Sequence, residues 1–197
     1  YKDYKANRPP PPDDLVPQFQ LIREATEAFG FFAIDKKGYE ADDIIATLAH
    51  NATEEGANVT IFSSDKDLMQ LVSENIKMYD PIRNIFIDIE RVKEKFGVTP
   101  DKVIDVQALI GDKVDNVPGV PGIGVKTASG LISEFRNVEN LIENYELINK
   151  DRIKNLISDN LDKIILSKKL VTLHKKVEID LNIGDLELAT LNLEKLL

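Results

Sequence analysis

The pattern of apolar residues changes near residue 98, and this change limits the folds that the chain can adopt. Before it, short apolar runs that are typical of buried strands alternate with amphipathic helical segments; after it, the pattern indicates helices only. Alternating strands and helices are typical of an α/β unit with a mostly parallel sheet. We therefore expect an α/β unit followed by an all-helical unit, with a boundary near residue 98.

The expected elements follow from periodicity and from the positions of glycine and proline. Strands are expected at 31–34, 58–63, 76–80 and 84–88. Helices are expected at 13–29, 40–55, 65–71, 89–96, 100–111, 124–135, 137–144, 150–157 and 159–173. Asp13 or Asp14 is expected to cap the first helix, which ends at Gly30.

Composition excludes several classes of site. The 197 residues include no cysteine and two histidines, His50 and His174, which lie far apart in the sequence. Disulfides and thiolate metal sites are therefore excluded, and neither a zinc site nor a Ser-His-Asp hydrolase is expected. No apolar run is long enough to cross a membrane, and the N-terminus has no apolar signal core, so no membrane span is expected. The absence of cysteine fits a cytoplasmic protein, which is what we expect. The chain starts without Met and ends inside an apolar helical pattern, so we expect a fragment of a longer protein.

Seven carboxylates stand in three tight clusters, each beside a predicted element. They are Glu40, Asp42 and Asp43, then Asp65 and Asp67, then Asp112 and Asp115. Clustered carboxylates repel one another, and hard divalent cations with oxygen ligands relieve the repulsion. If the clusters converge at one edge of the sheet, they would suit two Mg²⁺ or Mn²⁺ ions about 3.5–4 Å apart, which is an arrangement for phosphodiester hydrolysis.

Each cluster also has a local interpretation that the sequence leaves open. Glu40 and Asp43 share a helix face in a first turn that the helix dipole favours. Asp65 is a candidate N-cap, and Asp112 with Asp115 can form an ordinary Asx turn.

A glycine-rich hairpin follows the third cluster, with the sequence VPGVPGIGVKTASG at 117–130. Its candidate phosphate-binding residues are Gly119, Gly122, Gly124, Lys126 and Thr127. The glycines allow positive φ and close approach, and a helix that starts near Gly124 directs free N–H groups at a ligand.

Two motifs compete for this hairpin. Gly119 and Gly124 have the spacing of a P-loop, but Val125 occupies the lysine position and no strand precedes the segment, so we reject the P-loop. A helix–hairpin–helix, which contacts the nucleic-acid backbone without reading bases, fits better. A tight connector between two helices is the remaining alternative.

Four segments together resemble one family: YKDYKANRPPPPDDL, GYEADDIIATLA, SSDKDLMQLV and ALIGDKVDNVPGVPGIGVKTA. They are similar to the 5′ nuclease domain of bacterial DNA polymerase I and to the wider flap endonuclease family, over about residues 1–180. The resemblance implies a PIN-like nuclease core at 1–97 with a helical arch at about 9–30. It further implies a helix–hairpin–helix (helix–three-turn–helix) module at 98–176 and the start of a linker at 177–197.

The resemblance also implies roles for individual residues. The first metal ion would be held by Glu40, Asp42 and Asp43, and the second by Asp65, Asp67, Asp112 and Asp115. Lys5 and Arg8 would be catalytic, contacting the scissile phosphate, although a solvated basic chain end is the plainer interpretation of these two residues. The hairpin would contact DNA and hold K⁺ through backbone carbonyls.

The implied activity is that of a Mg²⁺-dependent 5′-3′ exonuclease and flap endonuclease in DNA replication and repair. Its partners would be DNA with a 5′ flap, nicked or branched DNA, and an RNA primer in duplex. We expect a nucleoid-associated monomer joined to polymerase domains. Two further metal aspartates of the family would precede Tyr1, so a nuclease-inactive DNA-binding fragment is the alternative. A PIN-like ribonuclease is a third hypothesis, against which the helices of 100–175 argue.

Overall fold

The computed structural model describes residues 1–196, which divide into two compact units. The first unit combines Tyr1–Arg8 with Ala52–Leu173, and the second combines Pro9–Asn51 with the segment from His174 onward. Among residues 1–196, no helix is both long and apolar enough to span a membrane.

The first unit contains a three-stranded sheet in the order β1-β2-β3. Its strands are β1 (Val59–Phe62), β2 (Ile76–Asp80) and β3 (Ile85–Ile87), which confirms the strands expected at 58–63, 76–80 and 84–88. β1 and β2 are parallel, but β2 and β3 are antiparallel, so the sheet is mixed rather than mostly parallel. The reason is the tight turn after β2, where Asp80 Oδ1 accepts the backbone N–H groups of Ile82 (3.0 Å) and Arg83 (3.1 Å). A turn this short can join only antiparallel strands.

The two faces of the sheet differ. Ile61, Met78 and Ile87 are buried on one face, as the period-2 pattern predicts. On the other face Phe62, Tyr79 and Phe86 form a row across the three strands, with ring centroids 5.2 and 5.0 Å apart. The short helix expected after β1 is the 3₁₀ helix η1 (Lys66–Leu71), which buries Leu68, Met69 and Leu71.

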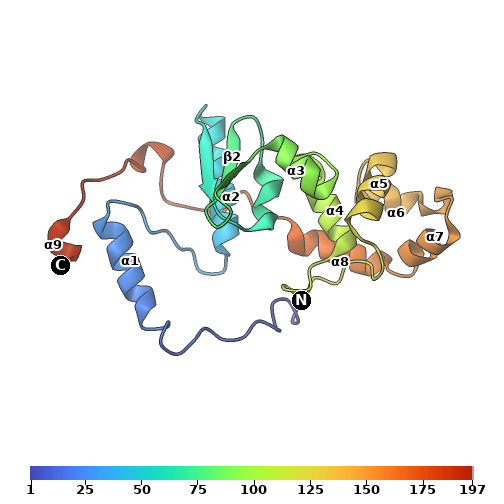
Figure 1. Cartoon of the computed structure of the whole chain (residues 1–197), viewed down its shortest axis with the longest axis horizontal. Helices are drawn as coiled ribbons and strands as arrows, with labels where there is room; N and C mark the ends of the chain where they lie inside the picture. The colour runs from blue at the N-terminus through green and yellow to red at the C-terminus, as the bar shows by residue number, and fades with distance from the viewer. Residues whose placement is uncertain (197) are drawn as a thin grey trace. The chain divides into compact units, whose positions relative to one another are not determined.

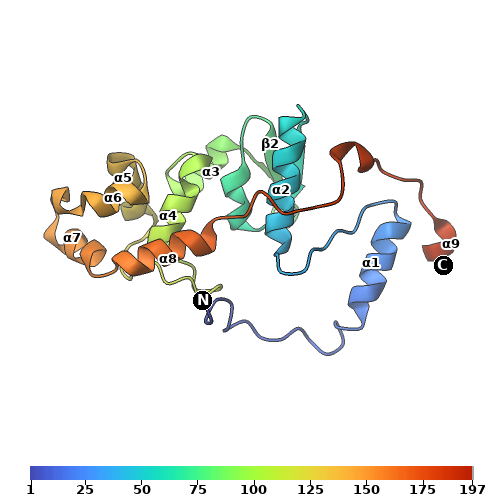
Figure 2. The same cartoon turned by 180° about the vertical axis from the view of Figure 1, so that it is seen from behind.

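Helices make up the rest of the first unit. They are α3 (Ile89–Phe96), η2 (Pro100–Lys102), α4 (Val103–Ile110), α5 (Val125–Phe135), α6 (Val138–Glu143), η3 (Tyr145–Leu147), α7 (Asp151–Ser158) and α8 (Leu161–Val171). The helix expected at 100–111 is divided into a 3₁₀ turn and an α-helix, and the other helices start and end close to the expected residues. α4 packs against α8, and the two helices lie next to each other in both views (Figures 1 and 2).

A buried ion pair stabilises the helical part. Asp105 of α4 is buried, and its Oδ1 accepts hydrogen bonds from Lys168 Nζ (2.8 Å) and from the Val138 N–H (3.1 Å). Lys168 also bonds Glu139 (2.7 Å), so these groups join α4, α6 and α8.

The second unit contains α1 (Gln18–Ala28), most of α2 (Ala41–Glu54), η4 (Ile183–Asp185) and α9 (Leu193–Leu196). Its two chain segments are joined by backbone bonds from Ala189 N to Gly30 O (3.0 Å) and from Asn192 N to Ala28 O (2.8 Å).

Two local predictions in this unit are wrong. Pro17, rather than Asp13 or Asp14, precedes the first helix, because proline is tolerated at a helix start but not in its interior. Residues 31–34 form no strand in the described structure, and Phe31 and Phe32 are 58% and 46% exposed. A short apolar run becomes a strand only where a neighbouring strand supplies hydrogen-bond partners, which the pattern alone does not report.

Candidate metal and phosphate site

Lys66 brings together two of the predicted metal ligands. Its Nζ lies 3.3 Å from Asp67 Oδ1 and forms a hydrogen-bonded ion pair with Asp112 Oδ2. The side chains of Asp67 and Asp112 are only 19% and 9% exposed. Two largely buried carboxylates from distant parts of the sequence therefore share one cation.

Local hydrogen bonds fix the orientation of these carboxylates. Asp65 is the N-cap of η1, and its Oδ1 accepts the Asp67 N–H (2.9 Å). Asp112 Oδ1 accepts the N–H groups of Val114 (2.7 Å) and Asp115 (3.3 Å), which is an Asx turn. The capping and turn bonds foreseen as local alternatives are thus present, and at Asp112 they leave Oδ2 to face Lys66.

Gln107 of α4 supports Asp67 from the core. Its Nε2 donates to Asp67 Oδ1, and the residue is 2% exposed. Its Oε1 is a buried acceptor for which the described residues provide no hydrogen-bond partner. The site therefore contains a buried amide oxygen that could accept a hydrogen bond or bind a cation.

Burial and charge shift the pKa values of this group in different directions. Burial raises the pKa of Asp67, and the neighbouring charge of Asp65 adds to this rise. Burial would also raise the pKa of Asp112, but the bond to Lys66 and the backbone N–H groups outweigh it and lower the pKa. Burial alone would lower the pKa of Lys66, but the bond to Asp112 and the charge of Asp67 raise it. The ammonium is thus stabilised in its charged form.

Asp115 binds the two predicted catalytic cations. Arg8 donates through Nε (3.0 Å) and Nη2 to Asp115 Oδ1, and Lys5 Nζ lies 3.8 Å from Oδ2. The Lys5 N–H also donates to Asp115 O (2.9 Å), while Asn116 Nδ2 donates to Asp3 O (2.7 Å). Residues 1–8 are therefore docked on the loop that carries the third carboxylate cluster, although the Arg8 side chain remains 48% exposed.

The first carboxylate cluster opens α2 in the second unit. Asp43 Oδ1 accepts the His174 N–H (2.8 Å), and its Oδ2 accepts the Glu40 N–H (3.3 Å). Asp42 lies beside Asp43 in the first turn of the helix. The expected convergence of this cluster with the other four carboxylates stays a prediction. Within residues 1–196, no three Asp, Glu, His or Cys side chains are grouped closely enough to hold a metal ion by themselves.

The three hairpin glycines differ in their surroundings. Gly119 (φ 54°) is buried, its N–H donates to Ser167 Oγ (2.9 Å), and an added Cβ would lie 2.4 Å from Gly111 N. Gly122 (φ 91°) and Gly124 (φ −101°) are exposed, and Gly124 is the N-cap of α5. Gly119 thus serves close packing, whereas Gly122 and Gly124 lie on the surface where a ligand could approach.

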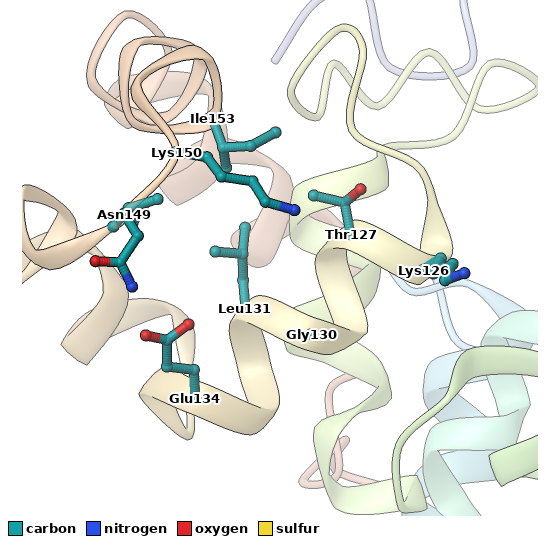
Figure 3. A pocket seen from close by; sticks show the side chains of 9 residues that line it. Lys126, Thr127, Gly130, Leu131, Glu134, Asn149, Lys150 and Ile153 are labelled. Atoms are coloured by element: carbon teal, nitrogen blue, oxygen red, sulfur yellow. The ribbon is translucent and has the colours of Figure 1, made fainter.

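A pocket of about 410 Å³ lies beside the start of α5. Lys126 and Thr127 line it together with Glu134, Asn149 and Lys150 (Figure 3). The Lys150 side chain extends toward α5 in the direction of Thr127, while Lys126 points away from the pocket (Figure 3).

Sequence reasoning missed Lys66, Gln107 and Lys150. The first had a signal, since it lies between two aspartates in the segment DKD. Gln107 is a polar residue at a core position of α4, which is a second signal, because buried polar groups need partners. Lys150 lies in no motif.

Comparison with known proteins covers the whole length of the chain. The family model described as 5′-3′ exonuclease, N-terminal resolvase-like domain, matches residues 1–97, and that described as 5′-3′ exonuclease, C-terminal SAM fold, matches residues 98–194.

DNA polymerase I of Rhizobium leguminosarum is 51% identical over 100% of this chain and 19% of its own length. The 5′-3′ exonuclease of Aquifex aeolicus is 42% identical over 100% of this chain and 66% of its own length. That of Buchnera aphidicola is 39% identical over 94% and 67%. The chain thus spans about a fifth of the first relative and about two thirds of the exonucleases.

Solved structures confirm the fold class. The T5 D15 protein co-crystallised with metal ions matches with a TM-score of 0.77 at 24% identity, over 88% of this chain and 68% of that one. The catalytic core of Rad2 in complex with DNA substrate matches with a TM-score of 0.58 at 17% identity, over 98% and 65%. A resolvase-like domain at 1–97 followed by a SAM-like helical domain at 98–194 agrees with the expected architecture.

Proposed function

Because this chain belongs to the 5′-3′ exonuclease family, whose relatives include a segment of DNA polymerase I, we propose that it hydrolyses phosphodiester bonds at 5′ ends and flaps of DNA with Mg²⁺ or Mn²⁺. The observation that carries this proposal is the shared cation of Asp67 and Asp112, next to a third carboxylate, Asp115, that binds Lys5 and Arg8.

The donor atoms suit a hard divalent cation. Asp67 and Asp112 supply carboxylate oxygens, and Gln107 Oε1 is a buried oxygen without a hydrogen-bond partner in the described residues. Mg²⁺ is commonly held by one or two carboxylates together with water and substrate phosphate, so a complete protein cage is not required. Asp65 and Asp115 would complete this set around the second metal ion, and Glu40, Asp42 and Asp43 would hold the first. Such a pair of ions activates water and stabilises the leaving oxygen.

Asp115 orients the cations that the reaction needs. Its carboxylate binds Arg8 and Lys5, while 48% of the Arg8 side chain remains exposed and can reach a phosphate. Charge that develops on the phosphoryl oxygens is stabilised by such fixed cations. Lys5 and Arg8 would therefore act on the scissile phosphate.

The start of α5 would bind the DNA backbone. Helix N-termini present free N–H groups to phosphates, and here Gly122, Gly124, Lys126 and Thr127 lie at or near the surface with Lys150 beside them. Carbonyl groups of the hairpin would hold K⁺ between the protein and a phosphate. This module, at 98–176, would act with an arch at about 9–30.

The proposed substrates are 5′ flaps, nicked or branched DNA and an RNA primer in duplex. In the longer DNA polymerase I relatives the matching segment is about a fifth of the protein, which supports a role beside polymerase domains in primer removal and repair. Among the similar solved structures, a T5 flap endonuclease and the Rad2 core are recorded in complex with DNA.

The test uses this chain with a labelled 5′-flap duplex, in Mg²⁺ and in EDTA, with binding and cleavage measured on the same samples. We expect Mg²⁺-dependent cutting at the junction. Asp115→Asn should slow it at least about 100-fold with DNA affinity nearly unchanged, since even outer groups of a metal site contribute 10–100-fold. Asp162→Asn, an exposed change in α8, is the control. Equal rates for Asp115→Asn and the wild type would refute the assignment, and binding without cutting would indicate a DNA-binding unit instead.

A further inference from the structure

The Lys66 ammonium lies where an ion shared by Asp67 and Asp112 would lie. It contacts Asp67 Oδ1 at 3.3 Å and Asp112 Oδ2 in a hydrogen-bonded ion pair. A Mg²⁺ ion held by the same two oxygens would need them at about 2.0–2.1 Å. The ammonium and the metal ion therefore cannot occupy this position together.

We propose that Lys66 is an internal cation that competes with the divalent ion for Asp67 and Asp112, so that metal binding requires the ammonium to leave. This inference rests on the metal site of the proposed function.

Lys66 has the freedom that such a displacement needs. It is the first residue of η1, its side chain is 36% exposed, and its backbone stays fixed by the cap at Asp65. A lysine side chain has a flexible four-carbon stem, so the ammonium can move to solvent without any change in the main chain.

The competition has two consequences. Without metal, Lys66 neutralises charge between the two carboxylates and keeps them close together, so the site remains assembled. With metal, the ion must replace an ammonium that makes two contacts, so the observed affinity is lower than the carboxylates alone would provide. A divalent ion can do this because it carries twice the charge of the group it displaces.

Lys95 provides a control that distinguishes the position held by the Lys66 ammonium from the effect of any nearby positive charge. It is close enough that the Lys66 charge contributes to lowering its pKa, after burial and the charge of Arg83. Its Nζ lies 5.7 Å from the Phe96 ring centroid, and the described residues include no ion pair between Lys95 and Asp67 or Asp112. Lys95→Met thus removes the same charge from the same region without vacating the shared position.

The experiment measures Mn²⁺ binding by isothermal titration calorimetry at one pH and salt concentration. The wild-type chain is compared with Lys66→Met, Lys95→Met and Asp112→Asn. We expect Lys66→Met to bind Mn²⁺ about tenfold more tightly, or ~1.4 kcal/mol. Lys95→Met should change the affinity less than about twofold, because screened charge effects without contact are small. Asp112→Asn should lose the site.

Each result decides the question. Unchanged or weaker binding by Lys66→Met overturns the inference, and so does equal tightening by Lys66→Met and Lys95→Met. If the wild type binds at a site that Asp112→Asn removes, the metal assignment survives either of these results. If neither the wild type nor Lys66→Met binds Mn²⁺, the metal site and the inference both fail.

A second readout follows the lysine itself. The ε-CH₂ resonance of Lys66, assigned by its loss in Lys66→Met, should shift on addition of Mg²⁺ in the wild type and stay unchanged in Asp112→Asn. If the protein binds Mg²⁺ at Asp112 but the Lys66 resonance does not shift at saturating Mg²⁺, displacement of the Lys66 ammonium is refuted.

Discussion

Alanine substitutions at the three hairpin glycines should have three different effects on stability. Gly119 combines a positive φ of 54° with a close backbone neighbour, since an added Cβ would lie 2.4 Å from Gly111 N and 2.6 Å from Ile110 C. Gly122 has φ 91°, but its Cβ would meet only Leu156 Cδ1 at 3.7 Å. Gly124 has φ −101°, and nothing lies within 4 Å of its added Cβ.

The magnitudes follow from strain and overlap. A left-handed alanine costs about 1–2 kcal/mol, and forcing backbone atoms apart costs about 1–3 kcal/mol more. Gly119→Ala should therefore lower the free energy of unfolding by about 3–4 kcal/mol. Gly122→Ala should lower it by about 1 kcal/mol, because alanine also restricts the unfolded chain. Gly124→Ala should change it by less than about 0.5 kcal/mol.

Urea unfolding of the three variants measures this order through shifts of the midpoint at constant slope. Duplex DNA binding is measured on the folded proteins at low temperature. We expect Gly124→Ala to keep its stability but to weaken DNA binding, because a methyl group at the exposed N-cap obstructs close approach of a phosphate. If Gly119→Ala is as stable as Gly124→Ala, the packing argument at Gly111 is wrong.

Two further predictions concern ion pairs. Lys168→Met should destabilise the chain by about 2–3 kcal/mol, because among residues 1–196 it leaves the buried Asp105 with the Val138 N–H as its one remaining donor. Thermal unfolding measures this loss, with Lys169→Met, an exposed change in α8, as the control. Arg8→Lys should slow flap cleavage about 10–100-fold without changing Mn²⁺ affinity, since lysine cannot reproduce the Nε and Nη2 bonds to Asp115. Wild-type cleavage by Arg8→Lys would show that this geometry is not used.

The elements were largely predictable because their signals are local. Period-2 and period-3.6 patterns located β1 to β3 and the helices from α3 to α8, and Gly97 closes α3 in the left-handed conformation that such a glycine suggests. The prediction failed at 31–34, where the outcome depends on a pairing partner rather than on the run itself. It also failed at the start of α1, where Pro17 overrides two nearby aspartates.

The sequence suggested the candidate site residues but not their arrangement. The pattern of acidic residues predicted Asp67 and Asp112 as metal ligands, and that role stays a prediction. The structure brings the two carboxylates together through Lys66, which lies 46 positions before Asp112. That pairing depends on how η1 packs beside α4, which no local signal encodes. The same is true of Gln107, whose amide meets Asp67 only because α4 presents it from the core.

The bond from the Gly119 N–H to Ser167 Oγ links the hairpin to a helix 48 residues later. Contacts so distant in sequence form late in folding, because the intervening chain must first lose loop entropy. The Val120 N–H to Leu109 O bond can form early, whereas the Gly119 bond must wait until α8 has docked on α4. During synthesis, the hairpin would thus reach its final shape only after residue 167 has left the ribosome, so a nascent chain that ends at α7 would carry the complete glycine motif without its native conformation.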